Sequence, residues 1–588
     1  MSKATALAEL AKRRGFFFQS SEPYGGAAGF YTYGPQGATL KHNVEDAWRE
    51  RFTVREGNME IQSPTVMPEP VFEASGHLDG FDDMIVECDE CGESHRADHL
   101  VEDHTDIDDA ESHSAEEVQA IIEDEAIACP VCGASLSGLP VEDFNLMFET
   151  NIGPGGVQPG YLRPETAQGI FVDFPRLKEY ARNRLPFGVT QIGPAYRNEI
   201  SPRGGLRRLR EFTQAELELF VDPETDEPPL ETVADVSLPL YSAARQNDDD
   251  ADGVRMLTVS EAVDGDIITE PWIAYYLGVG VQWFERIGVD LDRFRFRQHL
   301  AGERAHYASD CWDAEADVSG ADEDPDWIEI TGFAYRSDYD LAKHEAHGEG
   351  EFTIFKQYDD PITVERPTVD PDMSYLGPTF GGQAQAVIEA LEALAASDPD
   401  AFDADEVTVD VDGESATIPV EKTGFAVEEQ TEHGEHVLPH VVEPSFGIDR
   451  VVYTLLTHAH REDEVDGEPR TYLAFDPEVA PTFVGVFPLL SDLEGQAHEL
   501  TDELRASGLP AAYDDSGSIG RRYRRQDEVG TPFCVTLDEQ TETDDTVTIR
   551  DRDTTEQVRV EIDELPAVLA DLRTGRRSFG ELEAPTQV

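Results

Sequence analysis

Lysine and cysteine are scarce in this 588-residue chain, and long hydrophobic runs are missing. Only seven of its 45 basic residues are lysine, and it holds six cysteines. No run of about 18 apolar residues occurs, and the amino-terminal segment is a short charged helix pattern without the apolar core of a signal peptide. These absences exclude a disulfide-rich architecture and predict a cytoplasmic protein with no membrane segment.

Acidic residues dominate the composition instead. The chain has 122 Asp and Glu residues and a formal charge of −77. Self-repulsion of this size destabilises a compact chain unless salt screens it over about 3 Å, as molar salt does. The charge and the low lysine content therefore predict a halophilic protein from a salty cytosol, whose acidic runs are hydrated surface. With 39% hydrophobic residues, 29 Phe and 18 Tyr, the chain can still fill large cores.

Four of the six cysteines form two Cys-x-x-Cys pairs, each followed by a glycine. Such a turn presents two thiolates from one short loop, and two turns together suit a tetrahedral zinc ion. The 36-residue stretch from Glu93 to Ala128 is longer than the spacing that zinc ribbons usually have, and a metal-free set of reduced thiols is the alternative. The predicted ligands of a structural zinc are Cys88, Cys91, Cys129 and Cys132.

Shifts in composition predict two domains with two insertions. A mixed catalytic domain would span residues 1–477, interrupted by the cysteine insertion at 88–132 and a small α/β insertion at 366–440. Residues 478–588 alternate strand and helix patterns, with strands near 483–487 and 532–537 and helices near 493–504 and 565–572. This alternation predicts a separate compact α/β module.

Residues 196–220 carry the clearest chemical pattern. Arg197 and Glu199 are two apart, which on a strand puts them on one face, and a Gly204-Gly205 loop leads to a second strand beginning near Arg208. A β-hairpin of this kind would aim arginines and carboxylates into one cleft, where planar guanidinium groups suit phosphate. An exposed hairpin of paired charges explains the pattern equally well.

The hairpin resembles motif 2 of the class II aminoacyl-tRNA synthetases. EPSFGIDR (443–450) resembles their motif 3, and the helix and strand that end at Pro64 resemble motif 1. Segments 12–37, 144–154, 161–174, 305–315 and 327–344 are similar to dimeric glycyl-tRNA synthetases, and 519–536 and 546–560 to their anticodon-binding domain. The resemblance covers nearly the whole chain.

The resemblance implies an α+β fold with an antiparallel-sheet catalytic domain and a carboxy-terminal α/β anticodon-binding domain. It implies a homodimer that activates glycine with ATP and Mg²⁺ and transfers it to the 3′ end of its tRNA, with no membrane or DNA partner. Catalysis in this class is positioning and charge neutralisation without a protein nucleophile.

Motif 2 and motif 3 supply the expected ATP site. The match implies that Arg197 holds the α-phosphate and the substrate carboxylate, that Arg208 and Arg450 lie at the γ-phosphate, and that Phe212 stacks on adenine while Glu199 accepts from its amino group. Arg197 and Arg450 are the expected catalytic residues, and Glu329 is expected at the magnesium ion. The implied ATP-binding residues are Arg197, Asn198, Glu199, Arg207, Arg208, Leu209, Phe212, Glu329, Ile330, Gly447 and Arg450.

Glycine offers no side chain to grip, so its recognition must rest on the ammonium group and on excluding a β-carbon. Carboxylates at Glu165, Glu216 and Glu443 match the family's ammonium pocket, and an unpaired buried charge would penalise a wrong substrate. The implied glycine-binding residues are Arg96, Glu165, Phe212, Gln214, Glu216, Glu443, Pro444, Ser445 and Gly447.

Three alternatives stay open. A related synthetase for threonine, proline or histidine is disfavoured by Glu165 and by Glu443-Pro444-Ser445, and a non-catalytic protein on the same scaffold would not need Arg197, Glu199 and Arg450. The basic run 521–525 is either a phosphate contact for tRNA or a packed helix start.

Overall fold

The computed structural model describes residues 3–105, 107, 110–155, 158–202, 204–247, 253–300, 309–320, 323–411, 413–465 and 467–582. The start of the 305–315 motif lies outside these residues. The chain divides into one unit of Met1–Phe352 with Pro439–Val588 and a second of Thr353–Leu438. Across the described residues, no helix has both the length and the apolar character needed to cross a membrane.

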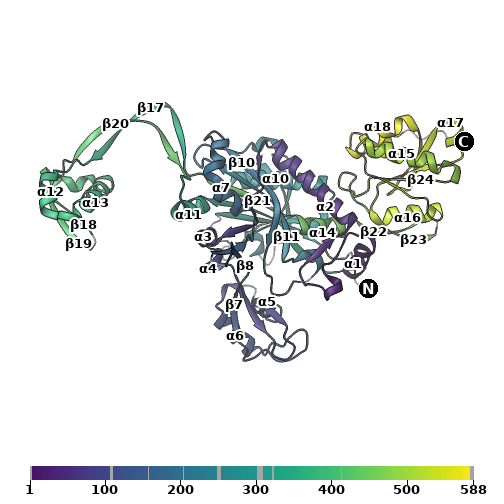
Figure 1. Ribbon diagram of the computed structural model, residues 1–588, viewed down its shortest axis with the longest axis horizontal. Helices are drawn as coiled ribbons and strands as arrows, with labels where there is room; N and C mark the ends of the chain where they lie inside the picture. The colour runs from purple at the N-terminus through teal and green to yellow at the C-terminus, as the bar shows by residue number, and fades with distance from the viewer. Residues whose placement is uncertain are drawn as a thin grey trace. The chain divides into compact units, whose positions relative to one another are not determined.

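A nine-stranded sheet forms the centre of the larger unit (Figure 1), and all but two of its strand pairs are antiparallel. This confirms the α+β class with an antiparallel catalytic sheet. In spatial order the strands are β13 (Arg255–Thr258), β12 (Ser237–Tyr241), β14 (Phe294–Gln298), β15 (Asp310–Asp317), β16 (Trp327–Ser337), β21 (His440–Gly447), β11 (Glu211–Val221), β10 (Phe187–Tyr196) and β3 (Met59–Glu60).

One face of this sheet packs against three helices, and the other carries buried polar groups beside aromatic packing between Phe220 of β11 and Phe174. Helices α2 (Pro35–Trp48), α10 (Pro271–Arg286) and α14 (Ile448–Ala459) share a core with the sheet, in which Trp48, Trp283 and Phe446 rings meet. Side chains alternate along a strand, so Ala215, Leu217 and Leu219 of β11 join this core. Their neighbours Gln214, Glu216 and Glu218 consequently point to the opposite face.

The motif 1 segment differs from its prediction. Helix α2 ends at Trp48 and continues as π-helical turns over Arg49–Arg55, and only Met59–Glu60 forms a strand instead of the stretch up to Pro64. The short strand pairs in parallel with β10, and the Thr53 and Thr190 hydroxyls lie 2.9 Å apart beside it. Pairing with β10 is limited to these residues because the chain then turns toward β4 (Val66–Pro68).

The cysteine insertion forms a small subdomain with its own core, which extends beyond 88–132 on both sides. Strands β5 (Asp82–Glu87), β6 (Ser94–Arg96) and β7 (Val141–Asn145) make a sheet in the order β6-β5-β7. Helices α5 (Ala97–Glu102) and α6 (Ala115–Asp124) cover it through Leu100, Val118 and Ile122. Helix α6 coincides with the acidic stretch in the middle of the insertion.

The second unit spans Thr353–Leu438, whereas the sequence placed this insertion at 366–440. Two long strands, β17 (Ile354–Thr368) and β20 (Ala426–Val437), pair with each other and carry mostly exposed side chains. Helices α12 (Met373–Phe380) and α13 (Ala384–Ser397) pack with the β18 (Glu406–Val411) and β19 (Glu414–Pro419) hairpin around a small hydrophobic core.

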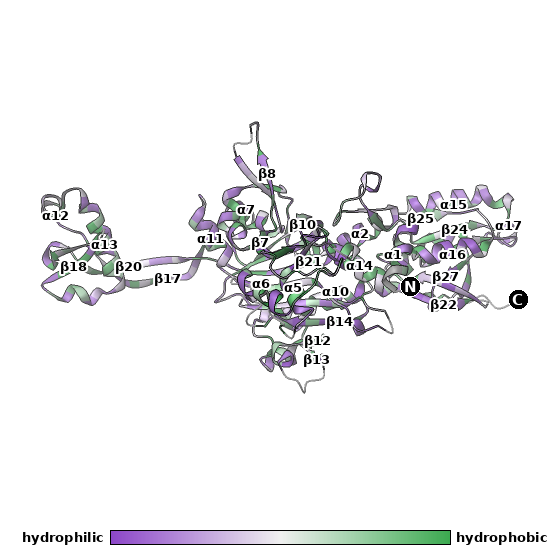
Figure 2. Cartoon of the chain, turned by 90° about the horizontal axis from the view of Figure 1, so that it is seen from below, coloured by the Kyte–Doolittle hydropathy of each residue, from purple (hydrophilic) through white to green (hydrophobic). Residues whose placement is uncertain are grey.

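The carboxy-terminal module has the predicted α/β alternation. Its sheet runs β25 (Ala511–Tyr513), β24 (Val484–Pro488), β26 (Phe533–Leu537), β27 (Thr546–Asp551) and β28 (Gln557–Glu561), with helices α15 (Glu494–Ala506), α16 (Ile519–Val529) and α18 (Leu565–Arg573). Strand β24 is hydrophobic, whereas much of α15 is hydrophilic (Figure 2), as expected for a buried strand and a surface helix.

The basic run 521–525 lies on helix α16 and makes contacts within the protein. Arg522 is buried and donates to the carbonyl oxygens of Pro488 and Gly517, and Arg525 pairs with Asp514 at 2.5 Å. These contacts favour the packed helix start over the phosphate contact.

Candidate functional site

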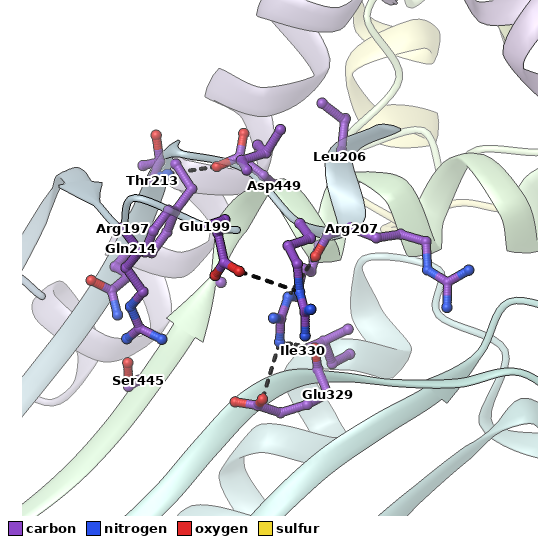
Figure 3. Close-up of a pocket in the computed structure, with 15 residues that line it drawn as sticks. Arg197, Glu199, Leu206, Arg207, Thr213, Gln214, Glu329, Ile330, Ser445 and Asp449 are labelled. Atoms are coloured by element: carbon purple, nitrogen blue, oxygen red, sulfur yellow. Dashed lines mark hydrogen bonds and ion pairs between the residues drawn. The ribbon is translucent and has the colours of Figure 1, made fainter. Parts of the chain in front are cut away.

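A pocket opens where the β10–β11 connection, β16, β21 and the first turn of α14 meet. It encloses about 610 Å³ of space that is open to solvent. Figure 3 shows Arg197, Gln214 and Ser445 at one end and Glu329 on the strand below. The lining residues are Arg197, Glu199, Leu206, Arg207, Arg208, Leu209, Phe212, Thr213, Gln214, Glu329, Ile330, Ser445, Gly447, Asp449 and Arg450.

The structure brings nearly all the expected ATP-binding residues together in this pocket. Of that set, only Asn198 is not among the lining residues. The expected glycine-binding residues divide, because Phe212, Gln214, Ser445 and Gly447 line the pocket while Arg96, Glu165, Glu216, Glu443 and Pro444 do not.

Four arginines line the pocket, and neighbouring groups fix three of them. Arg450 donates to the Glu329 carboxylate at 3.0 Å and to the Arg207 carbonyl oxygen at 3.0 Å. Arg208 lies 3.6 Å from Glu199. Arg207 forms a bidentate pair with Asp326 at 2.7 and 2.8 Å, and Figure 3 shows its side chain pointing away from Arg197. Paired guanidinium groups keep their orientation but still offer unused N–H donors.

Arg197 is held by rings instead of by acids. Its guanidinium carbon lies 5.4 Å from the ring centres of both Phe81 and Phe212, and its Nε donates to the Pro164 carbonyl oxygen at 3.3 Å. Within the described part of the chain, no carboxylate forms an ion pair with it. Stacking orients the planar group while its charge stays available to an anion.

The expected strand positions of Arg197, Glu199 and Arg208 are wrong. Strand β10 ends at Tyr196 and β11 begins at Glu211, so all three lie in the connection. Contacts with other segments cause this: the Asn198 amide donates to the Leu146 carbonyl oxygen at 2.8 Å, and the Arg210 amide donates to Gly29 at 2.9 Å. Such long-range bonds leave no trace in the local pattern.

A buried group of carboxylates adjoins the pocket at Gln214 and Ser445. The register of the sheet places Glu216 opposite Ser445, and Glu443 opposite Ala334 of β16. The Ser445 hydroxyl donates to Glu216 at 2.6 Å, and the Thr166 hydroxyl donates to its other oxygen. Glu216 therefore has a fixed position on the polar face of the sheet.

Arg336, which the sequence analysis did not single out, is the main counter-charge of this group. Only 3% of its surface is exposed, and it donates to Glu443 at 2.8 Å and to Asp340 at 2.7 and 2.9 Å. One guanidinium thus serves two carboxylates. Next to them, both oxygens of Glu218 are buried without a hydrogen-bond partner among the described residues.

The shortage of positive charge raises the pKa values of two carboxyl groups, Glu443 and Glu218. Burial raises the pKa of Glu443 to about 8, because Arg336 only partly offsets burial and the charges of Glu216 and Glu165. Burial and the neighbouring Glu443 raise the pKa of Glu218 well above its usual range. At neutral pH the Glu443 carboxyl group therefore keeps its proton while the site is empty.

Glu165 and Glu216 shift in opposite directions. Burial and the charge of Glu165 raise the pKa of Glu216. Burial also acts to raise the pKa of Glu165, but His77 and Arg336 hold it well below its ordinary value. His77 Nε2 lies 3.7 Å from Glu165, and Gln168 donates to it at 2.8 Å. Glu165 is therefore charged and aligned before any ligand arrives.

Arg96 is not at the carboxylate group. It lies at the end of β6, where it donates to Asp98 at 3.1 Å and pairs with Asp83 at 3.1 Å. Burial lowers the pKa of Arg208 and the charge of Arg96 contributes to the shift, which places Arg96 near the arginine end of the pocket.

Asp449 joins three parts of the site and was not identified from the sequence. It accepts from the Thr213 amide at 2.5 Å and from the Tyr33 hydroxyl. Because Thr213 lies between Phe212 and Gln214, these bonds attach the start of β11 to α14 and to β2 (Tyr31–Tyr33). An acid directly before Arg450 was the only available signal, and its partner Tyr33 is far away in the sequence.

The four paired cysteines lie together. Cys88 and Cys132 sulfurs are 3.6 Å apart, Cys91 and Cys129 sulfurs are 3.7 Å apart, and all four lie within 4.8 Å of one another. The two Cys-x-x-Cys pairs form turns of the same kind. In each turn the amide of the following glycine donates to the carbonyl oxygen of the first cysteine, from Gly92 to Cys88 and from Gly133 to Cys129, and both glycines have φ above +70°. A tetrahedral ion with metal–sulfur bonds of about 2.3 Å needs sulfurs about 3.8 Å apart, so the cluster fits one.

Two protein-family models match the chain. Residues 158–243 match the class II tRNA synthetase core domain for Gly, His, Pro, Ser and Thr, and residues 484–572 match an anticodon-binding domain. The first match covers β10, the motif 2 connection and β11, and the second covers most of the carboxy-terminal module.

Three archaeal relatives match along nearly their whole length. The chain is 48% identical over 592 residues to the glycine–tRNA ligase of Methanothrix thermoacetophila, covering 100% of both chains. It is 46% identical to that of Methanocaldococcus jannaschii, covering 95% of this chain and 97% of the relative. It is 47% identical to that of Archaeoglobus fulgidus, covering 98% of each.

The bonds of Asp449 predict a measurable stability difference. Tyr33→Phe removes a hydrogen bond to a buried carboxylate, so we expect the free energy of unfolding in urea to fall by about 1.5–3 kcal/mol. Tyr24→Phe is the matched control, because the Tyr24 side chain is 93% exposed and should tolerate the change. Equal stability of the two variants would contradict the role of the Tyr33–Asp449 bond.

Proposed function

The chain belongs to the glycine–tRNA ligases, and we propose that its arginine-lined pocket binds ATP while the adjoining carboxylates bind the glycine ammonium group. Enzymes of this family activate glycine with ATP and transfer it to tRNA. The observation that carries the assignment is that the two groups adjoin each other: Gln214 and Ser445 line the arginine pocket, and Ser445 donates directly to Glu216.

At the pocket, the protein's task is to hold two anions in line. The glycine carboxylate attacks the α-phosphorus of ATP, so both carry negative charge at the point of reaction. Arg197, which lies against two rings and forms no ion pair with any described carboxylate, would bridge them. Arg450 and Arg208 would neutralise the terminal phosphate, and the Phe212 ring would support adenine. Class II synthetases use ATP with Mg²⁺, and Glu329 is the carboxylate that would hold this ion and add charge neutralisation.

At the carboxylate group, the ammonium supplies the charge that Arg336 cannot. Glu165, Glu216 and Glu443 would surround it, and Glu443 would release its proton as the cation enters. The charged groups that act on Glu443 are Arg336, Glu216 and Glu165, and Glu218 lies next to it. Asp340 shares Arg336 with Glu443. Because Glu216 is fixed by two hydroxyl groups, a substrate with a β-carbon would have to displace a bonded carboxylate.

Other parts of the chain fit the same reaction. We propose a homodimer through the motif 1 segment, a carboxy-terminal module that binds the tRNA anticodon arm, and a cytoplasm salty enough to screen the charge of −77. Molar salt weakens bulk attraction to a polyanion, so tRNA recognition would rest on shape, hydrogen bonds and unstacked bases.

The glycine assignment predicts separate effects on the two substrates. Glu443→Gln keeps the size of the side chain and removes its charge, so we expect the KM for glycine to rise at least about tenfold and the KM for ATP to change less than about twofold. The measurement is amino-acid-dependent exchange of pyrophosphate into ATP in molar KCl, with alanine, threonine and proline beside glycine.

Glu285→Gln, an exposed change on α10, is the control and should leave both constants as they are. Equal losses for glycine and ATP in Glu443→Gln would argue against the ammonium role. Wild-type exchange with another amino acid and none with glycine would refute the substrate assignment.

The cysteine cluster predicts about one zinc ion per chain in purified protein, measured by elemental analysis. Cys91→Ser should lower the zinc content below about half an equivalent, because three thiolates bind zinc less tightly. Cys534→Ser, which changes a buried cysteine outside the cluster, should leave it unchanged. Less than about half an equivalent in the wild-type protein would contradict the zinc site.

A further inference from the structure

Strand β6 has three residues, and each contacts a different part of the larger unit. The carbonyl oxygen of Ser94 accepts a hydrogen bond from the Ser201 hydroxyl at 2.6 Å, and Ser201 belongs to the motif 2 connection. His95 Nε2 lies 3.3 Å from the Cys129 sulfur. Arg96 pairs with Asp83 and Asp98 near the arginine end of the pocket. The strand therefore runs between the cysteine cluster and the pocket.

Strand geometry explains this division. Successive side chains point to opposite faces, so His95 and Arg96 must face different neighbours. Pairing of Val86 with His95 and of Ile85 with Arg96 fixes the register against β5. His95 is only 4% exposed, and its buried ring nitrogen meets a sulfur, which places it against the cysteine cluster.

The other end of the strand is equally constrained. Asp98, 1% exposed, accepts a hydrogen bond from Arg96. Burial and the charges of Arg96 and Arg208 lower the pKa of the neighbouring His99 to about 4, and burial and the charge of Arg96 lower the pKa of Arg208. Arg208 lines the pocket. The main causes of the pKa shifts of Glu165, Glu216 and Glu443 are other groups, and neither Arg96 nor Arg208 is among them. A shift of β6 would therefore reach the ATP end of the site directly, through Arg96 and Arg208.

We infer that His95 is a positioning residue that couples the four-cysteine centre to the ATP pocket through β6. This inference rests on the zinc and ATP sites proposed above. A His95 N–H donated to a metal-bound thiolate is a stronger anchor than one donated to a neutral thiol, because the acceptor is charged. A loaded centre would thus hold β6, and with it Arg96 and Ser201, in the position seen here.

The first test compares His95→Phe with His104→Phe. Phenylalanine keeps the bulk of the ring but cannot donate to sulfur. The exposed His104 follows α5, and among the described residues its side chain bonds only to the backbone of that helix. We expect His95→Phe to keep its zinc, to raise the KM for ATP about tenfold and to leave the KM for glycine within about twofold. His104→Phe should behave like the wild type.

Retained zinc with an unchanged KM for ATP would overturn the inference, and so would an equal rise in both KM values, which indicates general damage. If His95→Phe loses its zinc, Ser201→Ala decides the question, because it cuts the other end of the path. It should keep its zinc and raise the KM for ATP, and an unchanged value would overturn the coupling.

The Ser201→Ala change also allows a double-mutant cycle with His95→Phe. Two residues on one path should give effects on the KM for ATP that do not add, whereas additive effects would contradict a shared path.

A second measurement does not depend on activity. Removal of zinc from the wild-type protein with a chelator should increase hydrogen–deuterium exchange in peptides that contain 94–96 and in the motif 2 connection, and leave β21 protected. Unchanged exchange in the motif 2 connection would overturn the coupling even if the enzyme uses glycine. Absence of glycine-dependent exchange of pyrophosphate in the untreated protein would instead refute the proposed function.

Discussion

The site depends on a shortage of positive charge around one buried group of carboxylates. Arg336 serves Glu443 and Asp340 together, while Glu218 has no partner among the described residues. A buried charge without a partner is costly, so burial raises the pKa of Glu443 to about 8 and the free protein keeps this proton at neutral pH. In the proposed site, an ammonium ion would replace this proton at little cost, and glycine could then bind although it has no side chain.

The adjoining pocket holds a guanidinium group that lacks an ion-paired acid among the described residues. Arg197 is oriented by the rings of Phe81 and Phe212, and no carboxylate forms an ion pair with it in the described part of the chain. The register of β11 against β21 fixes the position of the carboxylate group relative to the arginine pocket, because Gln214 and Ser445 lie between the two. A zwitterion with its ammonium at one end and its carboxylate at the other matches this arrangement.

Sequence reasoning reached the residue types of the site through resemblance, and the strand and helix pattern of the carboxy-terminal module through periodicity. It failed where distant segments decide the geometry. Arg197 lies outside the predicted strand because Asn198 bonds to Leu146 and Arg210 bonds to Gly29. Arg96 lies with Asp83 and Asp98. Arg336 and Tyr33 escaped notice because each is an ordinary residue whose importance comes from a buried partner.

Calorimetric titration of the protein with glycine tests the account most directly. Comparing buffers of different ionisation enthalpy gives the number of protons exchanged on binding. With the pKa of Glu443 at about 8 in the free site, the account predicts that close to one proton is released at pH 7 and fewer as the pH rises above 8. Glycine binding without proton release at pH 7, or with proton uptake, would contradict it.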